Sequence, residues 1–512
     1  MSREPQRRAG RGAGSAGCAA AHVLAASRAG AVSSALAICA ACVGPNFHRP
    51  APPPTDRYVA EPMPGETASA SGVAGAAQKF LSGGDVPRNW WTGFGSSELD
   101  TLVNAALSAS PTVASASAAL RQARENTAAQ RGSYFPAAQA AFDATRQRDA
   151  TGVLSPNLAS GTALYNLYTP QVTVTYVPDV FGANRRQVES LAAQADTAQF
   201  QLDATYLTLA GNVVTTAVTE AGLRAEISAT LRIVKLERES LAVMKRELEL
   251  GAIAEGDVYA QEAALGVLEA TLPPLRRQLD TAHDSLAVLT GHLPADLPPV
   301  RFELADLTLP TDLPLGVPSQ LVERRPDVRA AEAQLHAATA QVGVAIANML
   351  PQVLITADAG SSATAMSDLF KSGTGFWSIG ANLTQTLFEG GTLYHRKKAA
   401  DAGLDEAGAQ YRSAVLTAFQ NVADALHALD ADADALAAAA RAEDAARRSL
   451  EVADSRLKLG AVSYLALINA EQAYQQAVVS AAQARTNRFL DTAALFQALG
   501  GAVSPQAAAA SN

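Results

Sequence analysis

The sequence predicts a mixed α+β membrane protein in which four transmembrane β-strands per chain are combined with unusually long α-helices. Three observations lead to this fold class. Most of the chain is written twice, each copy contains two segments with strand-like alternation, and each copy contains a stretch of 68 or 69 residues without proline. The composition agrees, because 17% charged and 5% aromatic residues suit long helices that pack closely side by side.

The internal repeat is visible in short motifs that recur about 210 residues apart. The matching segments are 133–136 and 348–351, 180–182 and 387–390, 250–253 and 459–462, and 289–291 and 499–501. Such regular spacing indicates a duplicated structural unit. Each copy is expected to follow the order short helix, strand, strand, long helix, turn and return helix.

The strand-like segments alternate between apolar and polar residues. In 171–177, for example, Val172 and Val174 alternate with Thr173 and Thr175. Period 2 places apolar side chains on one face of a sheet and polar ones on the other. The same pattern is found in 139–147, 352–360 and 378–388, with Gln385 as a break. A half-buried soluble sheet alternates in the same way, but a length of about 10 residues also matches a membrane strand.

Four strands are too few to close a membrane barrel. Known membrane barrels begin at about 8 strands, and an open edge in lipid leaves backbone groups without hydrogen-bond partners. Several chains must therefore pool their strands. Three chains with four strands each would form a trimeric 12-stranded barrel, with 148–163 and 362–376 as outward-facing loops.

The helices are too long for a globular core. Residues 183–250 contain no proline, and at about 1.5 Å per residue a continuous helix would extend roughly 100 Å. Residues 391–459 form the second copy. Apolar and small residues recur by threes and fours, which predicts a coiled-coil-like seam. Return helices are expected at 257–290 and 465–499, and shorter helices at 97–132 and 326–347. A coiled-coil spacer without a lumen is the alternative interpretation of the helices alone.

The N-terminal region has the features of a bacterial export signal. Arginines precede a short apolar stretch that ends in small residues at Cys42. The three cysteines all lie in the first 42 residues, so a disulfide framework is excluded. Cys42 is the expected lipidation site, whereas Ile38 disfavours cleavage before Cys39. The expected segments are a signal peptide at 1–41, a lipidated tether at 42–88, the first repeat at 89–300, a linker at 301–325, the second repeat at 326–501 and a disordered tail at 502–512.

Several functions are disfavoured by the sequence. The formal net charge of −9 argues against nucleic acid as a partner, because phosphate binding needs a basic surface. No phosphate-binding loop, His-Glu-x-x-His pattern or nucleophile elbow occurs, and the seven histidines are scattered. The sequence therefore predicts no catalytic residue, no metal site and no cofactor apart from a covalent lipid on Cys42.

An ordered set of motifs resembles the TolC-like outer-membrane efflux factors, in the NodT-type lipoprotein branch. The most specific segment is 321–332, Leu-Val-Glu-Arg-Arg-Pro-Asp-Val-Arg-Ala-Ala-Glu, and 43–50 and 89–91 also match. The resemblance covers about residues 42–501. It implies a homotrimer with a 12-stranded barrel in the outer membrane and a helical tunnel in the periplasm. Pro326 and Asp327 are explained more simply, as the start of a helix.

The resemblance also implies functional sites at the far ends of the long helices. The adaptor-docking tip would consist of two turns that share a Leu-Gly-Ala sequence: Gly251, Ala252 and Ile253, and Gly460, Ala461 and Val462. A periplasmic gate just inside the tip would contain Asp257, Leu465 and Asn469. Because Asn469 stands where an aspartate is common in the family, a weaker attraction for cations is expected.

The resemblance favours a passive, gated exit duct of a tripartite efflux pump for small molecules, with a periplasmic membrane-fusion adaptor and an RND-type inner-membrane transporter as partners. The duct would be anchored in outer-membrane lipid and project into the periplasm. Two alternatives remain open from the sequence. One is the outer-membrane channel of a type I protein secretion system, and the other is a periplasmic structural coiled-coil lipoprotein without a pore.

Overall fold

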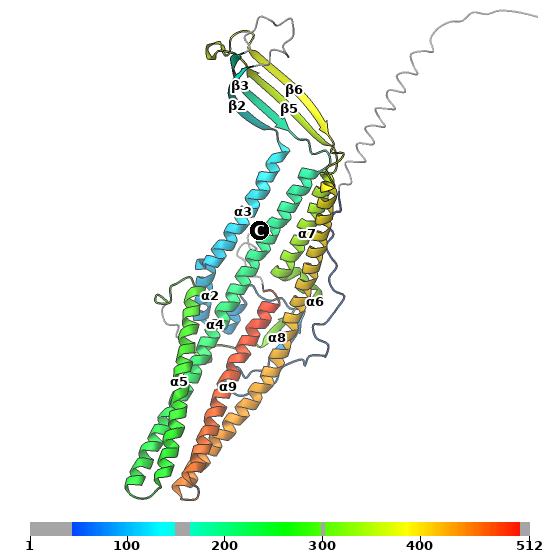
Figure 1. Ribbon diagram of the computed structural model, residues 1–512. Coiled ribbons are helices and arrows are strands. Elements are labelled where there is room, and N and C mark those ends of the chain that lie inside the picture. The colour runs from blue at the N-terminus through cyan, green and yellow to red at the C-terminus, as the bar shows by residue number, and fades with distance from the viewer. Residues whose placement is uncertain (1–43, 149–163, 298–302, 502–512) are drawn as a thin grey trace, which may run out of the picture. The chain divides into compact units, whose positions relative to one another are not determined.

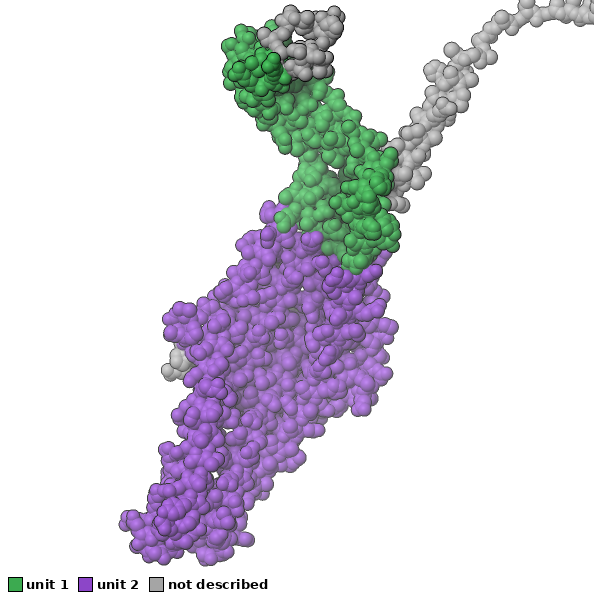
Figure 2. Space-filling view, in the orientation of Figure 1, with its two compact units in different colours: residues 1–47, 126–191, 336–404 green, residues 48–125, 192–335, 405–512 purple. Residues whose placement is uncertain are grey.

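The structure is a computed structural model that describes residues 44–148, 164–297 and 303–501 (Figure 1). The chain divides into two compact units, which are coloured separately in Figure 2. The first consists of residues 1–47, 126–191 and 336–404, and the second of residues 48–125, 192–335 and 405–512. Each unit takes segments from both sequence repeats, so neither repeat forms a compact unit of its own. The expected signal peptide, Cys42 and the expected tail lie outside the described residues.

The first unit contains one antiparallel sheet in the order β2-β3-β5-β6 (Figure 1). Its strands are β2 (Ala137–Arg148), β3 (Leu164–Tyr176), β5 (Gln352–Ser361) and β6 (Gly375–Thr384). The central pair joins the two repeats, with Val174 opposite Ala357. Side chains are exposed along the whole of β2 and β6, the outer strands. The four expected strands are confirmed.

The last strand is shorter than the sequence suggested. The expected strand 378–388 ends at Thr384, which pairs with Gln352 at the start of β5. Pro351 precedes Gln352 and has no N–H to donate, so the ladder cannot continue there. The Gln385 side chain instead donates to the carbonyl oxygen of Met349, at 3.1 Å.

The long helices match the expectation within two residues at each end. The helix α4 (Ala183–Glu249) is followed by α5 (Glu255–Leu289), and α8 (Thr392–Lys458) by α9 (Tyr464–Ala498). Gly251 (φ +71°) and Gly460 (φ +69°) follow α4 and α8 in the left-handed conformation that glycine adopts without strain. The helix α5 continues through Pro273 and Pro274, which have no equivalent in α9.

The shorter helices show why proline marks helix starts. The single helix expected at 97–132 is two helices, α2 (Ser97–Ala109) and α3 (Pro111–Arg131), because Pro111 disfavours helical backbone at Ser110. Ser96 caps α2 by accepting from the N–H of Leu99. The helix α7 (Pro326–Ala347) begins with proline and carries Asp327 in its first turn, as expected.

The expected tether and linker both contain regular structure in the second unit. The strand β1 (Lys79–Ser82) pairs in parallel with β4 (Asp312–Leu315). The expected linker 301–325 also includes α6 (Pro318–Arg324) and the short helix η5 (Leu304–Asp306). A strand of four residues is too short to give a periodic signal in the sequence, so neither β1 nor β4 is predicted.

The core of the second unit is aromatic where the N-terminal segment meets α9. The short helix η1 (Trp90–Phe94) places Trp90 against Phe496, with ring centroids 5.6 Å apart, and Phe94 against Phe489, at 6.1 Å. The remaining short helices are η2 (Gly132–Tyr134) and η6 (Met366–Asp368), both in the first unit. Among the described helices, none is both long and apolar enough to cross a membrane.

Arg488 on α9 connects three segments of the second unit. It is 1% exposed and donates to the carbonyl oxygen of Leu429 on α8, at 2.9 Å. Its guanidinium also donates to the Thr67 hydroxyl and the Ala76 carbonyl oxygen, both at 3.2 Å. A buried cation with these bonds holds the N-terminal segment to two helices that lie more than 350 residues later in the chain.

Replacing Arg488 tests this connection. Arg488→Met removes the three hydrogen bonds of a buried guanidinium, so we expect the free energy of unfolding to fall by about 2–4 kcal/mol. The measurement is denaturant unfolding of the purified protein in detergent. Arg448→Met is the matched control, because Arg448 is 71% exposed and its ion pair with Asp444 should contribute less than about 1 kcal/mol. Equal stability of the two variants would contradict the proposed connection.

Candidate functional site

The two expected docking turns are exposed and have the same backbone design. Leu250 and Leu459, which end the long helices, are 77% and 82% exposed. In each turn a backbone N–H closes back on the helix: Ala252 donates to the carbonyl of Glu247, and Ala461 to that of Arg456. The Gly251, Ala252, Gly460 and Ala461 positions are exposed, whereas Ile253 and Val462 are half-buried. The turns therefore present small residues and two apolar tips to a partner.

The three expected gate residues lie at the starts of the return helices. Asp257 is in the first turn of α5 and half-buried. Leu465, in the first turn of α9, is 58% exposed, and Asn469 one turn further on is also exposed. Both α9 side chains are therefore exposed in the single chain.

Tyr464 ties the α8–α9 hairpin to the α4–α5 hairpin. Its hydroxyl on α9 donates to the Glu247 carboxylate on α4. Burial raises the pKa of Tyr464 to about 12, with the bond to Glu247 and the charges of Glu247 and Asp257 adding to it. The phenol therefore stays a donor at physiological pH. This contact could not be predicted from the sequence, because its partners are 217 residues apart.

A second group of polar contacts, further from the turns, joins the α4–α5 hairpin to α9. Glu237 on α4 is 5% exposed, and it accepts a hydrogen bond from the side chain of Gln261 on α5, which is fully buried. The carboxyl group of Glu471 on α9 lies within hydrogen-bonding reach of the same two side chains. Nearby apolar residues, among them Ile233, surround this cluster. None of the three residues could be singled out from the sequence, since each alone has the pattern of an ordinary polar position on a helix.

A groove of about 660 Å³ lies beside this cluster, between α4, α8 and α9. Its apolar lining includes Leu236 and Val243, which are 54% and 57% exposed. Its polar lining is mainly acidic and includes Glu451 and Asp454 of α8. The groove belongs to the same end of the helices as the two turns.

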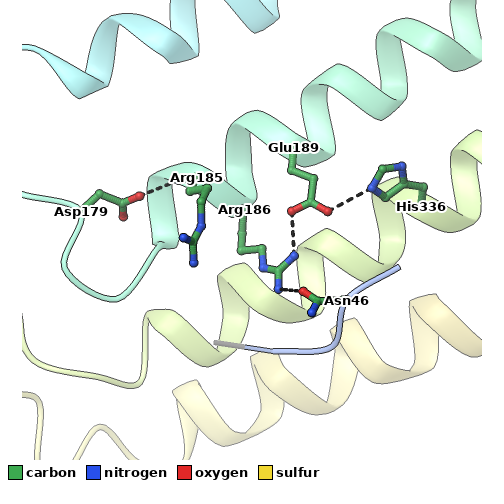
Figure 3. Close-up of polar contacts among 6 residues, drawn as sticks. All are labelled: Asn46, Asp179, Arg185, Arg186, Glu189 and His336. Carbon is green, nitrogen blue, oxygen red and sulfur yellow. Dashed lines mark hydrogen bonds and ion pairs between the residues drawn. The ribbon is translucent and has the colours of Figure 1, made fainter. Parts of the chain in front are cut away.

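The segment that follows Cys42 is held against α4 and α7 in the first unit (Figure 3). Arg186 donates to the side-chain oxygen of Asn46 at 2.6 Å and to Glu189 at 2.7 Å. Phe47 stacks on His336 with ring centroids 4.4 Å apart. A Cβ atom on Gly44 would lie 2.5 Å from Cα of Gly343, so only glycine fits there.

The polar contacts around Glu189 fix this docking. The ring nitrogen Nε2 of His336 lies 3.0 Å from the Glu189 carboxylate (Figure 3). Although burial opposes it, hydrogen bonds from His336 and Arg186 hold the pKa of Glu189 below its usual range. Glu189 therefore stays charged at neutral pH and keeps Arg186 oriented towards Asn46. Asp179 caps the start of α4 by accepting from the N–H groups of Asn184 and Arg185.

Within the ranges that the structure describes, no three His, Cys, Asp or Glu side chains are grouped so that they could hold a metal ion. The lipidation residue Cys42 lies outside those ranges. The expected docking turns and gate residues lie in the second unit. The segment 44–47, which follows Cys42, lies in the first.

The model of the family described as Outer membrane efflux protein matches residues 102–292 and 317–501. This chain belongs to that family. The two matched segments overlap the two expected repeats, 89–300 and 326–501. As in the family, the protein is an outer-membrane efflux channel component of a Gram-negative bacterium, and its long helices belong to the periplasm.

Individual relatives and solved structures agree with the family. The chain is 28% identical to the pyoverdine export outer membrane protein OpmQ of Pseudomonas putida over 81% of this chain and 88% of that protein. It is also 28% identical to the outer membrane protein OprJ of Pseudomonas aeruginosa, over 91% and 94%. The solved outer-membrane channel OprN superimposes with a TM-score of 0.80 at 27% identity, over 90% of this chain and all of that chain. The predicted fold class is confirmed.

The Tyr464 bond leads to a prediction about the efflux channel. Tyr464→Phe removes the donor to Glu247 and should weaken the packing of α9 against α4 by about 1 kcal/mol in each chain, which raises the open-to-closed ratio about fivefold for every chain of the channel. Single-channel recording in planar bilayers measures this ratio. Tyr259→Phe is the matched control, because its hydroxyl bonds Glu255 within the same helix. An equal rise in both variants would argue against the tie between hairpins.

Proposed function

We propose that this chain forms the homotrimeric exit duct of a tripartite efflux pump that serves an RND-type inner-membrane transporter. The observation that carries the proposal is the four-stranded sheet with unpaired outer edges at β2 and β6. A membrane sheet cannot leave its edges open to lipid. Three copies supply 12 strands, an even number within the range of outer-membrane barrels.

The two exposed turns support docking of a periplasmic membrane-fusion adaptor at the tip. Both carry a leucine followed by glycine and alanine, so a trimer would present six similar docking points around one axis. An adaptor built from repeated copies could contact all six points equivalently. Asp257, Leu465 and Asn469 lie immediately beside these turns, which allows docking to act on the gate without a long transmission path.

The relatives support small solutes as the cargo in preference to proteins. Their names include a pyoverdine export protein, a cation efflux protein and an antibiotic efflux pump protein. Such different cargoes in channels of one family fit a duct that does not select its substrate. Selection would then belong to the inner-membrane transporter, which would also provide the energy.

Conductance and mass together test the proposed duct. The purified protein should run as a trimer in native mass spectrometry and give small, mostly closed conductance in planar bilayers, because the gate is closed without its partners. Addition of a cognate adaptor should increase the open fraction. A monomer that gives no conductance would refute the proposal.

The contacts of Asn46 and Phe47 with α4 and α7 lead to a prediction about lipidation of Cys42. With Asn46 and Phe47 held on α4 and α7, a lipid two residues before Gly44 would stay within about 7 Å of that residue along the chain. Cys42→Ser should abolish incorporation of a palmitate analogue into the mature protein. Cys39→Ser is the matched control and should label like the wild type. Persistent labelling of the Cys42 variant would contradict lipidation at this position.

A further inference from the structure

The contact between Glu237 and Glu471 requires a proton. The two carboxyl groups lie within hydrogen-bonding reach of each other. A carboxylate can only accept hydrogen bonds, so such a contact forms when one of the two groups is protonated. Gln261 supplies one further donor, to Glu237. The geometry is that of two acids sharing one proton, as in other buried carboxyl pairs.

Among the described residues, no basic side chain forms an ion pair with Glu237 or Glu471 in place of that proton. The basic side chains nearest along α4 are engaged elsewhere: Arg238 pairs with Glu269 at 2.7 Å, and Lys245 with Glu262 of α5 at 2.6 Å. Lys458 of α8, which also lines the groove, pairs with Asp454 at 2.7 Å.

The other titratable groups around the pair are acidic or neutral. Glu239 and Glu247 of α4 and Glu451 and Asp454 of α8 line the groove beside it, together with the phenols of Tyr464 and Tyr474 of α9. The negative groups add to the cost of a second charge in the pair, so their field favours the protonated state.

The titration of the pair follows from this environment. Burial, together with the charge of Glu237, raises the pKa of Glu471 from its ordinary value of 4.5 to about 7. Burial also raises the pKa of Glu237, although bonds from Glu471 and Gln261 oppose the shift. The pair therefore holds its proton in mildly acidic medium and releases it to water near neutral pH.

We propose that Glu237 and Glu471 share one proton that holds α9 against α4 and α5, and that release of this proton favours opening of the duct. The inference rests on the proposed function as a gated duct and concerns the regulation of the same gate. Without the proton, two carboxylates lie in buried contact and repel each other, and separation of the helices relieves the repulsion. Asn469 of the gate lies two residues before Glu471 on α9, so such a movement acts directly on the gate.

The direction of the pH effect is fixed by linkage. The closed state binds the proton more tightly than the open state, in which Glu471 has its ordinary pKa of 4.5. Closed-state stabilisation is therefore complete below that value and is lost as the pH rises towards about 7. Each protomer contributes at most about a tenfold rise of the open-to-closed ratio per pH unit in this window, so a trimer that opens in one step gains at most about a thousandfold per pH unit, and the ratio then becomes constant.

Single-channel recording of the trimer across this pH window tests the proposal. Glu471→Gln places a neutral donor beside Glu237, so the ratio should stay low and lose its dependence on pH. Glu237→Gln should act in the same way. Glu239→Gln is the matched control, because Glu239 is 63% exposed, pairs with Lys235, and should leave the wild-type slope unchanged. An unchanged slope in Glu471→Gln would overturn the proposal.

An infrared titration separates this inference from the proposed function. Because burial raises the pKa of Asp491 to about 8 as well, the signal is the difference between wild type and Glu471→Gln. This difference should show a protonated-carboxyl band that disappears as the pH rises through about 7. Absence of that band from the difference overturns the shared proton, whether or not the protein conducts. If the band is present and no variant conducts at any pH, the proposed duct fails while the shared proton stands, and its link to gating is refuted.

Discussion

The pairing of β3 with β5 is the constraint on which the rest of the fold depends. It is the point where the first repeat meets the second within one sheet, and it leaves β2 and β6 as the outer strands. Because both repeats enter the sheet through this central pair, each chain presents two free edges of opposite origin. One chain can therefore join the next head to tail, β6 to β2, and a ring results when the rotation closes.

The duplication also explains why the helix ends are so alike. Four glycines with positive φ end the four long helices: Gly251, Gly291, Gly460 and Gly500. At Gly291 and Gly500 the neighbouring atoms leave no room for a side chain, whereas Gly251 and Gly460 are in open space. A glycine directly after a helix thus serves two purposes. At one end it permits tight packing against the core, and at the other it makes a compact turn that remains open to a partner.

The sequence predicted the long-range architecture well and the local irregularities poorly. Helix ends followed from proline-free runs bounded by glycine, so α4 and α8 were placed almost to the residue. The pairing of β1 with β4 could not be predicted, since it joins segments more than 230 residues apart and each strand has only four residues. The docking turns and gate residues came from a family resemblance. The buried contacts of Glu237, Glu471 and Tyr464 arise only when helices from different repeats are packed together.

The contacts of α9 with the N-terminal segment have a consequence for the order in which the protein can mature. Arg488 reaches Thr67 across 421 residues, and Thr492 accepts from Gln78 across 414. A chain that crosses the inner membrane from its N-terminus exposes the early segment long before its partner helix arrives. Contacts of this separation form slowly, and the apolar surface around Trp90 stays uncovered meanwhile. Burial of the N-terminal segment therefore waits for α9, the last helix that the structure describes.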